Sequence, residues 1–236
     1  MEVLSFKLWG DFGHFKKFYT TTSPLTFEFP PPATIIGIIS AIIGLDKKEY
    51  LHSFQNHEEF SIAVAIVNPV KKVRWSQNLI DTKQHFWLID NRTQIRIEFL
   101  KNPAFVIYFR HKNQNIHKKL QQHLEQHTCV YTVSLGLSEL LANFSYLGKE
   151  TLQLETSATW QQIRTVVPFS KLQNDSNVID FEPNKEVFKT NYPIWMEPDR
   201  VVSKREDIVF ERNGQSMRCK VKECWVTGGG EKIVFF

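Results

Sequence analysis

Hydrophobic residues alternate with polar ones or run continuously in a way that predicts several strands. Leu4, Phe6 and Leu8 alternate with more polar neighbours, which predicts a strand over residues 3–9 with one buried face. Residues 60–67 and 104–109 are continuous apolar runs, typical of strands buried on both faces. Residues 93–101 alternate again, and we expect them to form a hairpin with 104–109.

Two segments have the periodicity of helices. Residues 34–45 are almost entirely apolar and follow three prolines, which are tolerated at a helix start. Gly37, Ser40, Ala41 and Gly44 recur there at spacings of three and four, so we expect a flat stripe that another element approaches closely. Residues 113–127 place apolar side chains on one stripe and polar ones on the other side.

The order of these elements indicates an α+β fold. A strand, a helix, two buried strands, a second helix and a strand over 130–133 follow each other as in a ferredoxin-like domain, with a β-hairpin inserted at about 70–94. Strand patterns prevail after residue 151, and Asn213-Gly214 is the strongest hairpin turn. We therefore expect one domain over residues 1–150 and a small antiparallel β domain over 151–236.

Composition changes this picture mainly through the distribution of charge. The chain has 236 residues and a net charge of +4, with 42% hydrophobic and 23% charged residues, as in ordinary globular proteins. Residues 68–122 alone hold eleven Lys or Arg and three acidic residues, hence +8. Such a basic middle favours a surface that faces a polyanion, although a solvated basic face would look the same.

The segment between the first strand and the first helix is the main candidate site. Residues 10–24 carry Lys16 and Lys17 among aromatic residues, followed by four consecutive hydroxyl residues. Lysines neutralise phosphates, hydroxyls bond phosphate oxygens and rings stack on bases. The alternative is a long loop that packs its aromatics into its own core. The RNA-binding candidates are Trp9, Gly10, His14, Lys16, Lys17, Tyr19, Thr20, Thr21, Thr22 and Ser23.

The inserted hairpin is a second candidate surface. Basic residues interleaved with large aromatic ones fit a projection that wedges between nucleotides, or one that meets a neighbouring subunit, or both. Its candidates are Lys71, Lys72, Arg74, Trp75, Phe86, Trp87 and Arg92.

Catalytic chemistry is the weaker interpretation. A metal-independent ribonuclease needs a base, an acid and a cation, which Tyr108, His111 and Lys112 could supply if strand end and loop converge. His14 beside Lys16 and Lys17 is the other such set, and either set could bind RNA without cutting it. Histidines and cysteines lack the spacing of metal ligands, so we expect no metal and no cofactor.

The N-terminal residues also carry a family resemblance. The run Trp9-Gly10-Asp11-Phe12-Gly13-His14-Phe15-Lys16-Lys17-Phe18-Tyr19-Thr20-Thr21-Thr22-Ser23-Pro24-Leu25, then Phe29-Pro30-Pro31, Thr34-Ile35-Ile36-Gly37 and Ile42-Ile43-Gly44-Leu45, resembles the signature of the CRISPR-associated Cas-five family. This family belongs to the RAMP superfamily, and the type I-B (Hmari-like) subtype is the most similar. Residues 135–142 are a weaker match.

The resemblance implies a fold, a ligand and partners. It implies a ferredoxin-like (RRM-like) domain with a hairpin thumb and a small C-terminal β domain. It implies a subunit that holds the 5′ handle of crRNA at the foot of a Cascade complex, beside the large subunit and a backbone subunit. Contact with target DNA near the PAM stays open. One branch of the family, in type I-C systems, cleaves precursor crRNA without metal, whereas type I-B members do not cleave, so we expect a non-catalytic subunit.

We expect the protein to work in the cytoplasm and away from membranes. The longest apolar run, residues 35–45, is too short to span a bilayer, and residues 1–3 lack the start of a signal peptide. Cys129, Cys219 and Cys224 are odd in number, which favours reduced thiols.

Overall fold

A computed structural model describes residues 1–20, 22–46, 50–56, 58–80 and 92–236. The elements of the first part are β1 Glu2–Gly10, β2 Phe12–Gly13, α1 Pro32–Ile43, η1 His52–Phe54, β3 Phe60–Ile66, β4 Lys72–Ile80, β5 Arg92–Lys101, β6 Ala104–His111, α2 Gln114–Gln126 and β7 Ala142–Thr151. Those of the second part are β8 Gln153–Glu155, β9 Gln161–Ile163, β10 Val167–Pro168, η2 Phe169–Lys171, β11 Val187–Met196, β12 Val202–Glu211, β13 Met217–Cys219, β14 Cys224–Val226 and β15 Lys232–Ile233.

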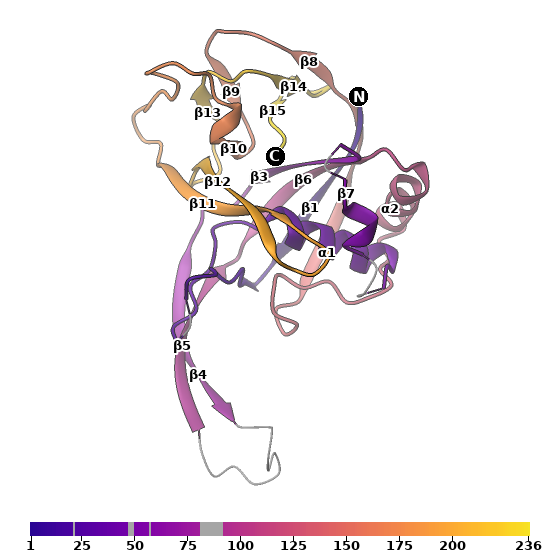
Figure 1. Cartoon of the computed structure of the whole chain (residues 1–236), viewed down its shortest axis with the longest axis vertical. Helices are drawn as coiled ribbons and strands as arrows, with labels where there is room; N and C mark the ends of the chain where they lie inside the picture. Colours follow the sequence, from indigo (N-terminus) through magenta and orange to yellow (C-terminus); the bar gives the residue numbers. More distant parts are fainter. Residues whose placement is uncertain (21, 47–49, 57, 81–91) are drawn as a thin grey trace.

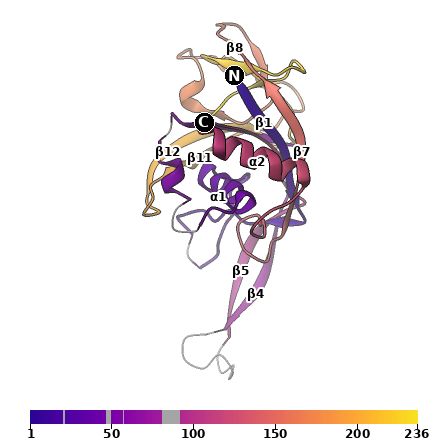
Figure 2. The ribbon, with the colours of Figure 1, turned by 90° about the vertical axis from the view of Figure 1, so that its right-hand side faces the viewer.

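The body of the protein is a four-stranded antiparallel sheet in the order β3-β6-β1-β7 (Figure 1). Because side chains alternate along a strand, one face of the sheet carries Leu4, Phe6 and Leu8 of β1 and packs against both helices (Figure 2). The other face carries Val3 and Tyr108, and the C-terminal segment with Ile233 and Phe235 packs against it. The sheet is thus buried on both sides, as the continuous apolar runs of β3 and β6 predict. For β1 the prediction of one buried face is wrong, because Val3 and Ser5 on its other face are buried as well.

The predicted strand over 130–133 is wrong. The backbone N–H groups of Val130 and Tyr131 donate instead to the carbonyls of Ile42 and Ala41, at 3.1 and 2.9 Å. The last carbonyls of a helix have no partner within the helix, so this segment satisfies the end of α1. The fourth strand of the sheet is β7, which pairs with β1 from Glu2 opposite Thr151 to Gly10 opposite Ala142.

Strand β5 also has a different partner from the predicted one. It pairs with β4 from Lys72 opposite Leu100 to Ile80 opposite Arg92, and it does not form a hairpin with β6. Asn102, with φ of 48°, turns the chain so that β6 enters the central sheet between β1 and β3. Strands β4 and β5 form a long hairpin that projects from the body (Figure 1), which we call the thumb hairpin.

The second part of the chain is β-rich, as predicted, but its strands are arranged differently. Strands β11 and β12 form a long hairpin whose inner face, with Tyr192, Ile208 and Phe210, joins the same buried cluster as α1. Asn213-Gly214 is a turn, yet the strands on either side of it pair elsewhere. The predicted boundary at residue 150 stays a prediction, and the two parts share one core.

The two predicted helices are present with good ends. Helix α1 begins at Pro32 and ends at Ile43, and the capping residue Gly44, with φ of 74°, donates its N–H to the carbonyl of Ser40. Asn113 caps α2 by accepting from the N–H of Asn115. In the part of the chain that the structure describes, neither helix is long and apolar enough to cross a membrane.

Candidate nucleic-acid interface

The loop between β1 and α1 folds back on itself, and this separates its two lysines. The N–H of Phe27 donates to Phe15 and the N–H of Lys17 donates to Leu25, each at 2.8 Å. Along such a ladder successive side chains point to opposite faces. Phe15 and Lys17 therefore lie inside, whereas Lys16 is exposed and has no carboxylate partner among the described residues.

Lys17 belongs to a buried charge network, which corrects its predicted role in binding phosphate. Its ammonium lies 3.1 Å from Glu28 and its side chain is only 10% exposed. Lys72 lies 2.8 Å from the same carboxylate and 3.2 Å from Glu98, and Arg74 lies 2.8 Å from Glu98. These ion pairs join the loop to the base of the thumb hairpin. They occupy Lys17 and Lys72, and they occupy the more exposed Arg74 to a lesser extent.

The electrostatics of the two carboxyl groups agree with this structural role. Burial opposes the ionisation of Glu28, but Lys72 and Lys17 outweigh it and hold the pKa below its usual value. For Glu98, burial is likewise outweighed by Arg74 and Lys72, and the pKa of this carboxyl is also lowered. The phenol of Tyr192, fully buried, donates to Glu28 at 3.1 Å and connects the network to β11.

His14 is also a structural residue. Its side chain is buried, and Nδ1 lies 2.7 Å from the carbonyl oxygen of Glu98. Burial lowers the pKa of His14, so the ring is neutral at neutral pH. Gly10 is needed for close packing, because a Cβ there would lie 2.7 Å from the carbonyl of Leu141. The half-buried Trp9 ring lies 5.4 Å from the Lys7 ammonium.

The hydroxyl residues of the loop divide in a similar way. The Thr20 hydroxyl donates to the carbonyl of Lys17 and accepts from the N–H of Leu25, which holds the turn. Thr22 and Ser23 are exposed, and Thr21 lies outside the described residues.

An exposed aromatic group lies at the tip of the loop. Tyr19 and Phe18 are 59% and 53% exposed and meet edge to face at 5.0 Å. The guanidinium carbon of Arg205, on β12, lies 3.5 Å from the centre of the Phe18 ring. Rings and a guanidinium stacked in this way and open to solvent offer flat faces on which another flat group can stack.

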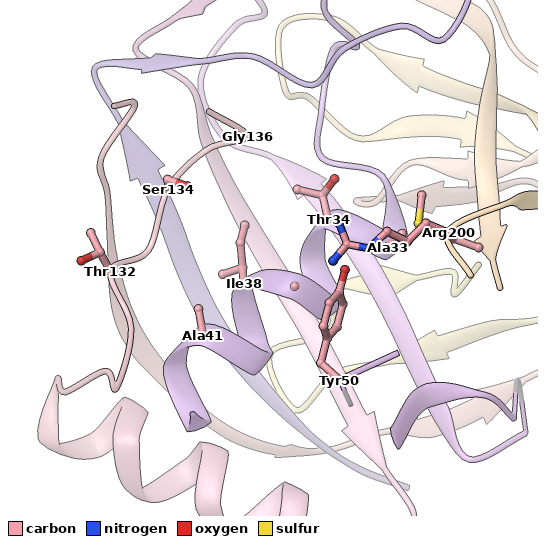
Figure 3. Close-up of a pocket in the computed structure, with 11 residues that line it drawn as sticks. Ala33, Thr34, Ile38, Ala41, Tyr50, Thr132, Ser134, Gly136 and Arg200 are labelled. Carbon is pink, nitrogen blue, oxygen red and sulfur yellow. The ribbon is translucent and has the colours of Figure 1, made fainter. Parts of the chain in front are cut away.

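A groove of about 360 Å³ lies over the exposed side of α1, and we call it the α1 groove. Figure 3 shows the guanidinium of Arg200, the hydroxyl of Tyr50 and the side chain of Thr34 converging on it. Gly37 and Ala41, two members of the small-residue stripe of the helix, also line it. The remaining lining residues are Ala33, Ile38, Thr132, Ser134, Gly136 and Met196.

The small-residue stripe does not have the predicted role of packing against another element along its length. A Cβ on Gly37 would meet no atom within 4 Å, so this part of the helix faces open space. Elsewhere the stripe is covered: Ser40 is buried, and Val130 lies 2.7 Å from a Cβ built on Gly44. At Gly37, therefore, a ligand can approach the helix backbone.

The α1 groove has the features of an anion site. It includes the start of α1, where Pro31 and Pro32 carry no N–H, Thr34 and Ile35 donate theirs to the Pro31 carbonyl, and the N–H of Ala33, without a partner in the described part of the chain, is left for a ligand. Pro31 supplies no side-chain cap, and the first turn of α1, all of it described, has no acidic residue. Arg200 is exposed and has no ion-pair partner among the described residues. A phosphate here would meet a guanidinium, hydroxyls and the N–H of Ala33.

The two faces of the thumb hairpin carry different side chains, and its basic and aromatic residues are not interleaved on one surface. Trp75 stacks on Phe99 at 4.2 Å and meets Phe12 edge to face at 4.6 Å, so it covers the base of the hairpin. The opposite face carries Arg74, Arg92 and the exposed Arg96 on alternating positions. Lys71 is exposed beside it, and Phe86 and Trp87 lie outside the described residues.

The alternative catalytic set does not converge. Tyr108 and His111 are an odd number of positions apart on β6 and lie on opposite faces of the sheet. Tyr108 donates to Glu231, and burial and this carboxylate raise its pKa. His111 packs against Phe54, burial lowers its pKa, and Lys112 is exposed. The His14 set is separated too, since His14 and Lys17 are buried in different contacts.

Sequence reasoning did not find Arg200, Arg205, Tyr50 or Thr34. The two arginines lie in the second part of the chain and reach the site only because β11 and β12 fold back over the first. In the described part of the chain, no group of three or more His, Cys, Asp and Glu residues could hold a metal ion. The expected absence of a metal stays a prediction.

Comparisons with known proteins agree with this fold. Residues 3–177 match the family described as CRISPR-associated protein (Cas_Cas5). Because this match covers well over half of the 236 residues, the chain belongs to that family. A search of curated proteins gave no match.

Several solved structures share the architecture. A CRISPR protein from Archaeoglobus fulgidus is 14% identical with a TM-score of 0.59, over 98% of this chain and 97% of that one. A chain of a CRISPR RNA-guided surveillance complex is 10% identical with a TM-score of 0.52, over 92% and 91%. A chain of the type III-B Cmr-beta complex bound to cognate target RNA is 10% identical with a TM-score of 0.50, over 92% and 86%. At these identities the likeness shows the fold.

Proposed function

We propose that the protein is a non-catalytic crRNA-binding subunit of a type I-B Cascade complex and holds the 5′ handle of the crRNA. Membership of the Cas_Cas5 family supports this, as does the fold shared with a chain of an RNA-guided surveillance complex. We also propose a ferredoxin-like first domain, which the strand order β3-β6-β1-β7 with both helices on one face supports.

The observation that carries the proposal is the α1 groove. A single-stranded RNA needs cations for its phosphates, hydrogen-bond donors to fix its register and space for its backbone. Arg200 supplies the cation, and the hydroxyls of Thr34 and Tyr50 and the N–H of Ala33 supply donors. Gly37 leaves room for close approach to the helix backbone.

The RNA path extends from the groove to the tip of the loop. Gly136, at one edge of the groove, lies against the carbonyl of His14, and a Cβ there would overlap this oxygen at 1.9 Å. Lys16, two residues beyond His14, is exposed and available for phosphate. Tyr19 and the stacked pair of Phe18 and Arg205 then offer ring faces to bases. In this proposal Lys16 replaces Lys17 as the phosphate-binding lysine.

Protein partners are part of the proposal. Strand β7 is an edge strand of the central sheet, and four large apolar side chains, two at β7 and two beside the C-terminal end of α1, are about half exposed or more. They are Val130, Tyr131, Leu141 and Leu147. We propose that this side meets the backbone subunit or the large subunit, with the basic face of the thumb hairpin close to the crRNA and, at the PAM, to target DNA.

The experiment is a salt titration of RNA binding with a repeat-derived single-stranded RNA. Arg200→Ala and Lys16→Ala should each weaken binding and reduce the slope of log K against log salt by about 0.7, the contribution of one phosphate contact on a single strand. Lys118→Ala is the matched control, because Lys118 is exposed on the water-facing side of α2. Equal affinity and slope in all four proteins would contradict the proposed site.

A second measurement separates binding from cleavage. We expect purified protein to leave repeat RNA intact in EDTA, because Tyr108 and His111 lie on opposite faces of the sheet. A discrete RNA product that forms in EDTA and is lost in His111→Asn would instead identify a metal-independent endoribonuclease.

A further inference from the structure

A second cavity, of about 290 Å³, lies between the base of the thumb hairpin and the β11–β12 hairpin. Its walls are Val70, Lys72, Phe188, Thr190, Phe210 and Arg212, and Glu28 also borders it. We call it the Phe188 pocket. It is separate from the α1 groove and shares no lining residue with it.

Aromatic rings dominate one wall of the Phe188 pocket. Phe210 is buried, and Phe188 lies beside it with ring centroids 6.0 Å apart and ring planes inclined by 25°. Phe188 is 46% exposed although it borders a cavity. Phe188 and Phe210 lie opposite each other on β11 and β12, and a half-exposed ring beside a buried one is a stacking surface for a flat, apolar-faced ligand.

Polar groups at the pocket divide into engaged and available ones. The Lys72 ammonium already contacts Glu28, Glu98 and the carbonyl of Thr26. Arg212 donates Nε to Val70 and Nη1 to Glu186, which leaves Nη2 without a partner among the described residues. The Thr190 hydroxyl also has no partner there. The available groups are therefore hydrogen-bond donors beside an aromatic wall.

This combination fits the chemistry of a nucleobase. A base has two flat faces for stacking and carries ring nitrogen or carbonyl acceptors on its edge, and its phosphate is an anion that a guanidinium binds. An aliphatic peptide side chain would use the apolar wall but not the donors of Arg212 and Thr190. The two sites lie at opposite ends of the β11–β12 hairpin, because Arg200 lies in its turn and Phe188 and Arg212 lie at its other end.

We propose that the Phe188 pocket receives one unstacked nucleobase of the RNA that this protein binds, a proposal that rests on the proposed function. The base stacks on Phe188, and Arg212 and Thr190 donate to its edge or to its phosphate. The pocket thereby places one nucleotide at the foot of the thumb hairpin, where Val70 and Lys72 form the facing wall.

The test combines protein variants with abasic sites in the RNA. The probes are a fluorescein-labelled, repeat-derived single-stranded RNA and a series of the same RNA with one abasic nucleotide at each position. Phe188→Ala should weaken binding of the intact RNA about fivefold or more, at the low end of the loss expected for one stacked base. Phe188→Trp should retain affinity, and Phe188→Leu should behave like Phe188→Ala. Phe181→Ala is the matched control, because Phe181 is 74% exposed and borders neither cavity.

The decisive result is coupling between one ring and one base. We expect one abasic position to weaken binding to the wild type by about the same factor as Phe188→Ala, with no further loss when the two are combined. If the losses from Phe188→Ala and from the abasic site are additive at every position, the proposal is overturned. The proposed function still stands in that case, because the wild type binds the RNA. Wild-type protein that binds no RNA would overturn both.

A free nucleotide would present the same chemistry from another source. Titration of adenosine and guanosine monophosphates in the absence of RNA distinguishes it. Saturable binding that Phe188→Ala abolishes, together with an RNA that has no coupled position, would overturn an RNA-derived base and identify a free nucleotide. We expect that neither nucleotide binds at millimolar concentration and that one abasic position in the RNA is coupled to Phe188.

Discussion

Glu28→Ala is the substitution that best tests whether Lys17 is a structural residue. The Glu28 carboxylate accepts from Lys17 at 3.1 Å, from Lys72 at 2.8 Å and from the Tyr192 phenol at 3.1 Å. Lys72 keeps Glu98 and the Thr26 carbonyl when Glu28 is removed. Lys17 has no second carboxylate among the described residues, and only the Phe27 ring, 5.4 Å away, remains near its ammonium.

The expected cost follows from the burial of this ion pair. The side chains of Lys17 and Glu28 are 10% and 12% exposed, so the pair is largely shielded from solvent. Removing one partner of a buried pair typically costs about 3–5 kcal/mol, because an uncompensated charge is left behind. We expect about 3 kcal/mol for Glu28→Ala, since the flexible lysine stem can partly reach water. For a chain of this size, this corresponds to a loss in Tm of about 6–12 °C.

Urea unfolding followed by circular dichroism measures this cost. Glu2→Ala is the control, because the Glu2–Lys149 pair is 59% and 43% exposed and should contribute less than about 1 kcal/mol. Glu28→Ala combined with Lys17→Met should be no less stable than Glu28→Ala alone, because the unpaired charge is then gone. A loss below about 1 kcal/mol for Glu28→Ala, or additive effects of the two changes, would refute the structural role of Lys17.

Three further predictions concern local geometry and protonation. Gly37→Ala should raise stability by about 0.5–1 kcal/mol in urea unfolding, because its Cβ meets no atom within 4 Å, whereas Gly37→Phe should keep the fold and weaken RNA binding in a filter assay by filling the α1 groove. Gly136→Ala should lower stability by about 2–4 kcal/mol, since φ is 103° and a Cβ would lie 1.9 Å from the carbonyl oxygen of His14. Burial lowers the pKa of His111 and His117 below the ordinary 6.5, so the unfolded chain takes up protons first and stability should fall as pH drops from 6.5 towards the folded pKa. Thermal scans between pH 7.5 and 5.5 should show this slope, and His117→Leu should reduce it.

Each of these has an outcome that would count against it. A Tm of Gly37→Ala below that of the wild type would contradict the prediction that this substitution is stabilising. An unchanged unfolding midpoint in Gly136→Ala would mean that the backbone there relaxes freely. Equal acid slopes in wild type and His117→Leu would remove His117 from the pH dependence.

Much of the fold was predictable because hydrophobic periodicity is local. Strand β1, helices α1 and α2, strand β3 and strand β6 all lie where alternation or continuous apolar runs place them. Strand pairing was less predictable, because it depends on which other strand has an edge without a hydrogen-bonding partner in the folded protein. The alternating pattern of β5 is compatible with pairing to β4 or to β6, and in the structure β5 pairs with β4. The 130–133 segment donates hydrogen bonds to the last carbonyls of α1 and does not join a sheet.

The candidate site was predicted only in outline. The sequence indicates a functional loop rich in Lys and aromatic residues, but two adjacent lysines look alike until the ladder of Phe15–Lys17 with Leu25–Phe27 sets their directions. The missing information was the positions of Glu28 and Glu98. Glu28 lies eleven residues after Lys17 in the same loop and Glu98 lies on β5, and no local pattern predicts that they meet Lys17 and Lys72. Arg200 and Arg205 depend on a contact between the two parts of the chain that no local pattern encodes.

The most direct test of the RNA path is crosslinking between the protein and a repeat-derived RNA that carries 4-thiouridine, with the crosslinked residues identified by mass spectrometry. The account predicts adducts at Tyr50 and Tyr19 and in the peptide that contains Arg200, because these residues line the α1 groove or the exposed tip of the loop. It predicts none at Lys17, whose ammonium is held by Glu28. Adducts confined to the water-facing side of α2, or concentrated at Lys17, would contradict it.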